Sequence, residues 1–484
     1  MTPFIGRQVE LSMLHKRLER IRTTGEGVAV AIRGRRQVGK SRLVQEFCDA
    51  AGVPYLFFAA TKGAAARETV NDFVAELAAS TLAAAPELVP EQLPGGWPDA
   101  FRALAGQLPP TPAVVVIDEL PWLAEQDDLF DGALQAAWDR LLARRPVLLL
   151  LLGSDIHMME RLTAYDRPFF GRADNLVLGP LNPAETGRAL ALEPAEAIDA
   201  HLISGGLPGI LRSWPSAMPP LTFLEQECTD PAAPLFSVPE SALLAEFPAP
   251  DRARRVLEAV GSGDRTHANI AATAGSQAGS LPSGSLSPLL QRLTEEKRVL
   301  AIDHPLGTKP TKPALYRVAD SNLRLYLAAG RAAQEQARRG RPDSGIALLR
   351  RRWPAWRGKS VEPLIRESLE LATSSGTLPW RNTGAVGGWW NRQFAPEVDL
   401  VGADKAPVAG RIDFVGSIKW LEGVFDRHDL DDLLRSALHV PGFTHGRTGV
   451  VVATRGGVDQ EIDHDRIDVV WRPDDVIASW PDPR

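Results

Sequence analysis

The chain has 484 residues, of which 44% are hydrophobic and 24% charged, with a net charge of −6, and this predicts a soluble globular protein of about three domains. Its two cysteines, Cys48 and Cys228, are too few for a disulfide framework or a cysteine-based metal site. The N-terminus has no secretory pattern and the longest apolar run, residues 146–152, is too short to cross a bilayer, which favours a cytoplasmic protein without a membrane partner.

Residues 28–41 predict a nucleotide-binding loop. An apolar run precedes Gly34-x-x-x-x-Gly39-Lys40-Ser41, and an amphipathic helix begins near Lys40. In this context backbone amides surround the β-phosphate, Lys40 reaches the β- and γ-phosphates, and the Ser41 hydroxyl binds Mg²⁺. The alternative is a chance match in a glycine-rich turn, but strand, spacing and helix all agree with the loop. The predicted nucleotide contacts of this segment are Gly34, Arg35, Arg36, Gln37, Val38, Gly39, Lys40, Ser41 and Arg42.

A second apolar run ends in two carboxylates. Residues 113–117 are all apolar, and Asp118 and Glu119 follow them. Ligands of parallel α/β sheets gather at the carboxyl ends of the strands. We therefore expect Asp118 to hold Mg²⁺ through its hydration shell and Glu119 to polarise the attacking water. An acidic pair after a strand also commonly caps a helix, and the loop upstream favours the catalytic interpretation.

A third strand, over residues 146–153, ends at Ser154. Its hydroxyl either senses the γ-phosphate and orients the attacking water, or it lies in an ordinary turn. The remaining predicted elements of this part are strands at 54–60 and 175–178 and helices at 70–79 and 130–143. The expected fold class is α/β, with the doubly wound parallel sheet of a P-loop NTPase.

Several short motifs follow one another along the chain: Phe4-Ile-Gly6-Arg7-x-x-Glu10, the loop at 34–41, Val116–Trp122, Leu152-Gly-Ser154, Phe170-Gly-Arg172 and Gly205-Gly-Leu-Pro208. Together they resemble the archaeal-type ATPase family, in the signal-transduction (STAND) class of AAA-related NTPases. The resemblance implies that Gly6 and Arg7 lie near the adenine and that Pro208 belongs to a helical subdomain after the nucleotide core. It also implies that Arg172 approaches the γ-phosphate, in cis or across an assembly, with an ordinary salt bridge as the alternative.

The middle of the chain carries the pattern of a winged helix-turn-helix. A helix from Asp251, a second helix capped by Thr266, a third helix from Ser285 and two strands follow one another. The module either packs against the ATPase or a protein partner, or it binds DNA. In the second case the expected contacts are Gln291, Arg292, Lys309 and Lys312. Residues 331–359 hold nine Lys or Arg against two Asp or Glu, which indicates a polyanion-facing surface or a basic linker.

The C-terminal part contains acids and a lysine in a defined order: Glu362 on a helix, Glu397 and Asp399 on a strand, and Lys419 at the end of the next strand. This order resembles the PD-(D/E)xK restriction-endonuclease-like fold, and the archaeal-type ATPase family ends in such a domain. Its chemistry needs carboxylates around a divalent metal and a lysine that stabilises charge on the phosphate. Ser417 stands where an acid normally precedes the lysine, which lowers the expected metal affinity. DNA cleavage therefore competes with a fold retained for binding or assembly.

The expected domains are a P-loop ATPase core at 1–182, a helical subdomain at 183–248, a winged helix at 249–330, a linker or helix at 331–357 and an endonuclease-like domain at 358–484. We expect an ATPase that binds ATP and Mg²⁺, hydrolyses ATP slowly and acts as a nucleotide-dependent switch. Its expected partners are DNA through the winged helix, another protein or a second copy of the chain. The alternatives are an ATP-gated DNA-processing nuclease and a non-enzymatic transcription regulator that binds nucleotide only as a ligand.

Overall fold

The computed structural model describes residues 4–90, 95–162, 164–165, 167–247, 252–275, 279–310 and 313–480. The chain divides into two compact units, the first ending at Pro180 and the second beginning at Leu181. The expected end of the ATPase core at residue 182 lies close to this division, and the later expected boundaries all lie within the second unit. Among the described residues, no helix is both long enough and apolar enough to span a membrane.

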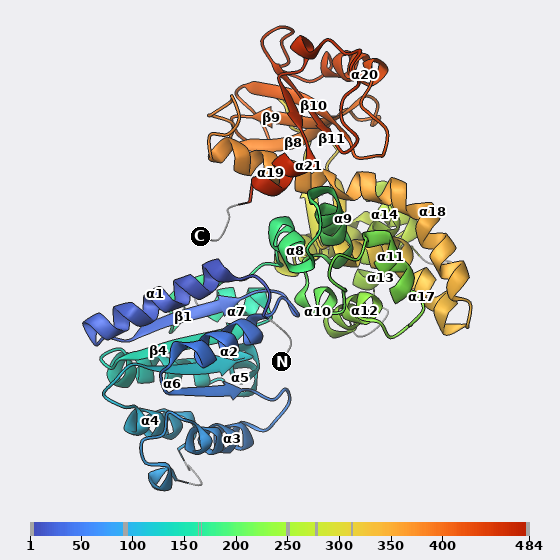
Figure 1. Ribbon diagram of the computed structural model, residues 1–484. Coiled ribbons are helices and arrows are strands. Elements are labelled where there is room, and N and C mark those ends of the chain that lie inside the picture. The colour runs from blue at the N-terminus through green and yellow to red at the C-terminus, as the bar shows by residue number, and fades with distance from the viewer. Residues whose placement is uncertain are drawn as a thin grey trace. The chain divides into compact units, whose positions relative to one another are not determined.

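A five-stranded parallel sheet with the strand order β2-β3-β4-β1-β5 forms the centre of the first unit (Figure 1). Strands β1, β3 and β4 are almost completely buried, as parallel strands with helices on both faces require. This arrangement agrees with the expected α/β fold of a P-loop NTPase core. The strands are β1 (Val28–Arg33), β2 (Tyr55–Ala59), β3 (Ala113–Asp118), β4 (Val147–Gly153) and β5 (Ala173–Val177).

Helices pack against this sheet. Helices α1 and α2 contact each other and strands β4 and β3, while α3, α4 and α6 share a core cluster with alternate residues of the strands. In that cluster Trp97 lies edge to face with both Phe73 and Phe130. The helix expected at 130–143 is divided into α6 and a π-helical turn, η2. The helical elements are α1 (Gln8–Thr24), α2 (Lys40–Ala51), α3 (Ala66–Ala79), η1 (Pro86–Leu88), α4 (Trp97–Gln107), α5 (Leu120–Gln126), α6 (Phe130–Ala137), η2 (Trp138–Leu142) and α7 (Ile156–Leu162).

Five short helices open the second unit, and each begins with a proline. Proline suits the first position of a helix because its fixed φ is already helical and its missing N–H would have no partner there. The first of these helices also has a capping box, in which the Asn182 side chain accepts the backbone N–H of Glu185 at 2.8 Å. The five are α8 (Pro183–Leu190), α9 (Pro194–Ser204), α10 (Pro208–Leu211), α11 (Pro220–Glu227) and α12 (Pro234–Glu246).

The residues expected to form a winged helix contain three helices and a pair of antiparallel strands. Thr266 caps the second helix as predicted, since its hydroxyl accepts the backbone N–H of Asn269 at 3.2 Å. The third helix begins at Ser283, two residues before the predicted start. The elements are α13 (Arg252–Ser262), α14 (His267–Thr273), α15 (Ser283–Gln291), the π-helical turn η3 (Arg292–Glu296), β6 (Leu300–Asp303) and β7 (Leu315–Val318).

The basic segment at 331–359 is helical. Helices α17 and α18 pack against each other, and acids on α11, α12 and α13 neutralise part of the charge of these helices. The pairs are Arg331 with Glu258 at 2.6 Å, Arg338 with Glu240 at 2.9 Å and Arg350 with Glu225 at 2.6 Å. The elements here are α16 (Ser321–Leu325), the π-helical turn η4 (Tyr326–Gly330), α17 (Arg331–Arg338) and α18 (Pro342–Ser360).

The C-terminal sheet is mixed, with the order β12-β11-β10-β9-β8. Strands β8 to β10 pair antiparallel and β10 to β12 pair parallel. Helices α19 and α21 cover one face of this sheet and α20 covers the other (Figure 1). The elements are α19 (Glu362–Ser374), β8 (Ala385–Trp390), β9 (Glu397–Ala403), β10 (Ile412–Lys419), α20 (Arg427–Ala437), β11 (Gly449–Thr454), η5 (His464–Arg466), β12 (Val469–Trp471) and α21 (Pro473–Ala478).

A buried carboxylate on α9 joins the helices of the second unit to this sheet. Asp199 is 3% exposed, and its Oδ2 atom lies 3.2 Å from Nη1 of Arg357 on α18 and 3.0 Å from Nη1 of Arg455 after β11. Both arginines also pair with Glu422, which follows β10. A buried charge is strongly unfavourable unless opposite charges surround it. These ion pairs therefore hold α9 and α18 in place against the sheet.

Replacing Asp199 with alanine leaves Arg357 and Arg455 without their shared buried acid. We expect the free energy of unfolding to fall by about 3–5 kcal/mol, the usual cost of breaking a buried ion pair. Urea unfolding followed by tryptophan fluorescence measures the change. The control is Glu225→Ala, which removes an exposed ion pair and should have a much smaller effect. Equal losses in the two variants would contradict the role given to Asp199.

Candidate functional site

The loop between β1 and α2 has a fixed conformation. Helix α2 begins at Lys40, so the unpaired N–H groups of its first turn lie at the predicted phosphate loop. A side chain is excluded at Gly34, because a Cβ atom there would lie 2.2 Å from the carbonyl oxygen of Leu178. Gln37 has a φ of 67°, a left-handed conformation that non-glycine residues adopt at a cost. Such local strain is common where a loop must present its backbone to a ligand.

Lys40 is enclosed by this loop. Its side chain is 6% exposed, and Nζ donates to the carbonyl oxygens of Gly34 at 2.7 Å and Arg35 at 3.1 Å. Burial lowers the pKa of Lys40 to about 8, although the nearby carboxylates of Glu119 and Asp118 oppose the shift. The structure therefore places a buried ammonium next to the loop in which phosphate oxygens are expected to bind.

Ser41 and Asp118 come together at the ends of α2 and β3. The Ser41 hydroxyl donates to Oδ2 of Asp118 at 2.5 Å, and Asp118 is 5% exposed. A hydroxyl and a carboxylate are oxygen ligands of the kind that Mg²⁺ prefers, so these two residues fit the expected metal. In the described part of the chain no group of three or more His, Cys, Asp or Glu is arranged to hold a metal ion. Ser41 and Asp118 therefore fit a Mg²⁺ site in which phosphate and water supply the remaining ligands.

Glu119 lies beside this pair in a strained conformation. Its φ is 55°, at the N-terminal end of α5, and its backbone N–H donates to Oδ1 of Asp118 at 2.8 Å. The Ser154 hydroxyl, which follows the neighbouring strand β4, donates to the Glu119 carboxylate at 3.0 Å. The fold therefore brings Lys40, Asp118, Glu119 and Ser154 to one edge of the sheet, as the sequence predicted.

Arg7 connects the loop to the end of the first unit. The residue is 4% exposed, and Nη2 donates to the carbonyl oxygens of Val38 at 3.0 Å and Gly179 at 2.5 Å. Nη1 pairs with Glu10 at 3.1 Å. These contacts make Arg7 a brace of the phosphate loop, a role that the resemblance did not suggest.

The other residues expected to contact nucleotide lie around the loop. Arg36 and Gln37 are exposed, whereas Val38 is buried and Gly39 has a φ of 92°. Gly6 also has a positive φ, 63°, just before Arg7. Arg42 pairs with Glu46 at 2.8 Å and its guanidinium lies 5.9 Å from the centre of the Phe4 ring. The N-terminal motif therefore passes next to α2.

Arg172 and Pro208, which the family resemblance singled out, have contacts outside the loop at 34–41. Arg172 makes a two-pronged ion pair with Asp139 at 2.8 and 2.9 Å, and it donates to the carbonyl oxygens of Pro168 and Phe170. This is the salt bridge that the sequence left open as the alternative. Pro208 begins α10 in the second unit. The approach of Arg172 to the γ-phosphate and a nucleotide contact of Pro208 stay predictions.

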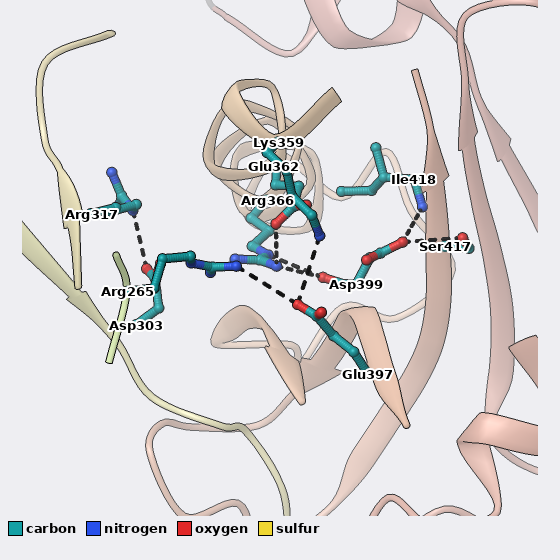
Figure 2. A network of polar contacts seen from close by, with 10 residues as sticks. All are labelled: Arg265, Asp303, Arg317, Lys359, Glu362, Arg366, Glu397, Asp399, Ser417 and Ile418. Atoms are coloured by element: carbon teal, nitrogen blue, oxygen red, sulfur yellow. Dashed lines mark hydrogen bonds and ion pairs between the residues drawn. The ribbon is translucent and has the colours of Figure 1, made fainter. Parts of the chain in front are cut away.

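The acids of the predicted nuclease centre form a polar network with internal cations (Figure 2). The two carboxylate oxygens of Glu362 pair with Lys359 at 2.9 Å and with Arg366 at 3.3 Å. Oδ2 of Asp399 accepts the Ser417 hydroxyl at 3.1 Å and the Ile418 N–H at 3.0 Å. Glu397 lies 3.9 Å from Lys359 and 4.0 Å from Arg265.

Lys419 points to a different partner. It forms an ion pair with Asp429, and the same Asp429 carboxylate accepts the Asp426 N–H in the capping box of α20. The lysine expected to face a phosphate is thus engaged with α20, and Ser417 supplies no charge. This set of residues does not fit the divalent metal of a nuclease.

The described residues expected to contact DNA are exposed, at the end of α15 and in the loop between β6 and β7, and that loop is covered in part. Gln291, Arg292 and Lys309 are exposed, and Lys312 lies outside the described residues. The loop after β6 packs on the C-terminal sheet: the Leu306 N–H donates to Gly388 at 2.9 Å, and Leu306 is buried in the same cluster as Trp389. The loop after β6 thus packs on the C-terminal sheet of the same chain, and both expected roles of the module, packing on the ATPase or a protein partner and binding of DNA, stay predictions.

Sequence comparison identifies the first part of the chain. The family model described as an AAA ATPase domain matches residues 3–150. The N-terminal part of this chain carries an AAA ATPase domain. No curated protein matches the chain by sequence.

Several solved structures resemble a longer part of the chain, between 67% and 78% of it, more distantly. The Walker-type ATPase of Pyrococcus abyssi is 19% identical with a TM-score of 0.47, and the match covers 67% of this chain and 96% of that one. The ORC2 protein of Aeropyrum pernix, solved as ADPNP–ADP complexes, is 13% identical with a TM-score of 0.44, covering 70% and 96%. A STAND protein with a tetratricopeptide repeat sensor from Pyrococcus horikoshii is 15% identical with a TM-score of 0.31, covering 78% and 51%.

Lys359 and Arg366 belong to none of the sequence motifs, although their spacing from Glu362 indicates contact with it. Lys359 and Arg366 lie three residues before and four residues after Glu362, which is the spacing of neighbours on one helical face. That spacing predicts the ion pairs seen in the structure. For Arg7 in the AAA ATPase domain, no pattern indicates contact with Gly179, which is 172 residues away.

The pKa of Lys40, about 8, predicts a pH dependence of nucleotide binding. Phosphate binding favours the protonated ammonium, so the affinity should be nearly constant below pH 7 and fall about tenfold between pH 7 and pH 9. Calorimetric titration with ATP in excess Mg²⁺ at pH 7, 8 and 9 measures this. The control Lys62→Gln removes an exposed lysine outside the loop and should keep the same profile. An affinity that does not change over this range would show that Lys40 does not bind phosphate.

Proposed function

We propose that the AAA ATPase domain binds ATP with Mg²⁺, hydrolyses it slowly and acts as a nucleotide-dependent switch. The observation that carries this proposal is the contact between Ser41 and Asp118, with Lys40 and Glu119 beside it. A hydroxyl, a carboxylate, an ammonium and a second carboxylate at the carboxyl edge of one sheet are the groups that phosphoryl transfer from ATP requires.

Phosphate binding replaces contacts that Lys40 now makes within the protein. Its ammonium donates to two loop carbonyl oxygens, and phosphate oxygens carry more negative charge than these acceptors. Ser41 and Asp118 would hold Mg²⁺, which neutralises charge on the phosphates. The positive groups at this edge of the sheet thus favour a triphosphate.

Glu119 is the general base in this proposal. Its carboxylate is fixed from two sides, because the backbone holds it at a strained φ and Ser154 donates a hydrogen bond to it. A base must be held at a fixed place to remove a proton from water.

In this proposal Arg7 couples the phosphate loop to the end of the first unit. One nitrogen of its guanidinium donates both to Val38 in the phosphate loop and to Gly179, two residues before the second unit begins. A movement of the loop on nucleotide binding therefore changes the restraint on Gly179. On the other side of the division, the Leu181 N–H donates to Gly206 at 2.9 Å.

The second unit contributes binding surfaces in this proposal. The order of α13 to α15 and of β6 and β7 supports a winged helix, and α19 with the mixed sheet supports an endonuclease-like fold. We propose that both serve in assembly and in binding a protein partner or a second copy of the chain. The packing of Leu306 on the C-terminal sheet supports this role over base readout by the hairpin.

Replacing Glu119 with glutamine separates binding from hydrolysis. We expect Glu119→Gln to bind ATP within about threefold of the original affinity, because the amide keeps the shape, and to lose at least about 100-fold in turnover. Phosphate release and calorimetry measure the two properties. Glu125→Gln is the control, since Glu125 lies exposed on the same helix and should keep full turnover. Undiminished turnover in Glu119→Gln would exclude Glu119 as the base.

A further inference from the structure

Glu362 is neutralised inside the C-terminal part of the chain. It is 5% exposed, and its two oxygens lie against two different cations, Lys359 and Arg366. Arg366 lies one turn after Glu362 on α19, and Lys359 lies three residues before Glu362 in the last turn of α18, so the junction of the two helices brings both cations to this acid. Each carboxylate oxygen of Glu362 therefore has a positively charged partner.

Arg366 extends this neutralisation to β9. Its guanidinium donates to the backbone carbonyl of Asp399 through Nη2 at 2.9 Å and through Nε at 3.1 Å. The residue is also buried, 8% exposed, so this cation lies between the helix and the strand that carry the two acids. The Asp399 carboxylate itself is held by Ser417 and Ile418 (Figure 2).

We infer that Lys359 and Arg366 supply the positive charge that a divalent metal would supply between Glu362 and Asp399, so that this cluster is an ion-pair junction that works without metal. A divalent cation placed there would meet two fixed cations at close range, and such repulsion is strong in a partly buried site. Burial and the nearby Glu362 raise the pKa of Asp399, as expected for two acids side by side, and the two cations oppose that shift.

The junction binds another segment of the same chain. Glu397, at the start of β9, faces Lys359 and also Arg265, which lies between α13 and α14. The loop after β6 completes this contact, because the Ala409 N–H donates to Gly307 at 3.0 Å and the Thr308 N–H donates to Pro441 at 2.9 Å. Of the acids that resemble a nuclease centre, Glu397 therefore faces Arg265 in the turn between α13 and α14.

The test measures Mn²⁺ binding by the full chain without nucleotide. The starting protein carries Asp118→Asn, which removes the metal ligand proposed in the AAA ATPase domain. Electron paramagnetic resonance of free Mn²⁺ gives the number of ions bound. We expect no site in the C-terminal part with a Kd below about 1 mM, the weak end of protein sites for divalent cations. Addition of Asp399→Asn should leave the titration unchanged.

Removal of both cations, the buried Arg366 and the half-exposed Lys359, should create a metal site. We expect Lys359→Gln with Arg366→Gln to bind Mn²⁺ at least about tenfold more tightly than the starting protein, because the repulsion is gone. Asp399→Asn should abolish that gain. The matched control, Arg392→Gln with Lys405→Gln, removes two exposed cations of the same domain and should bind no additional Mn²⁺.

Two outcomes would overturn the inference. The first is Mn²⁺ binding by the starting protein that Asp399→Asn abolishes, since the cluster would then be a metal centre. The second is a folded double variant, with an unchanged circular dichroism spectrum, that gains no Mn²⁺ site. If the double variant does not fold, Lys359→Gln alone replaces it, and a gain of less than about threefold would overturn the inference equally. Neither result depends on whether the AAA ATPase domain hydrolyses ATP.

Discussion

One buried cation determines the arrangement of the nucleotide site. The ammonium of Lys40 is enclosed by the loop after β1, where the carbonyl oxygens of Gly34 and Arg35 and the nearby acids Glu119 and Asp118 balance its charge. A buried lysine keeps its proton only when oxygen atoms surround it. The same site contains the strained conformations of Gln37 and Glu119 and the close approach of Leu178, which follows β5, to Gly34.

The strand order explains why residues distant in sequence act together. Strand β4 lies between β1 and β3, so the ends of these three strands carry the loop, Asp118 with Glu119, and Ser154 to the same edge. Arg7 then connects this edge to Gly179. In the second unit Asp199 and the packing of Leu306 join the helices, the hairpin and the C-terminal sheet. Ion pairs and apolar contacts therefore connect the helices, the hairpin and the C-terminal sheet of the second unit, which begins at residue 181.

The sequence predicted the local structure around Lys40, the loop between a buried strand and a helix, because its signals are local. The loop, the strand before it and the helix after it lie within fourteen consecutive residues, 28–41, and backbone geometry alone fixes their relation. The parallel sheet was predictable for the same reason, since each strand is a short apolar run. The Arg7 contact with Gly179 was not, because nothing in local spacing reveals a contact across the domain.

The C-terminal site shows the limit of reading motifs. The order Glu362, Asp399, Lys419 is present, but competing partners decide what each residue does. Lys419 pairs with Asp429 because α20 begins beside the end of β10, and Glu362 pairs with Lys359 at the end of α18 and with Arg366 on α19. A sequence motif specifies residue types and spacing, but it does not show which other charged residues lie next to them in the fold. The basic segment was likewise read as an exposed surface or linker, whereas acids from α11 to α13 neutralise part of it.

Calorimetric titration of the purified chain with ATP and Mg²⁺ tests the nucleotide site most directly. The prediction is binding of about one nucleotide per chain, with a heat signal that disappears in Lys40→Ala, because charge-assisted hydrogen bonds from that ammonium hold the phosphates. The absence of any heat at millimolar nucleotide, or an unchanged signal in Lys40→Ala, would contradict the account.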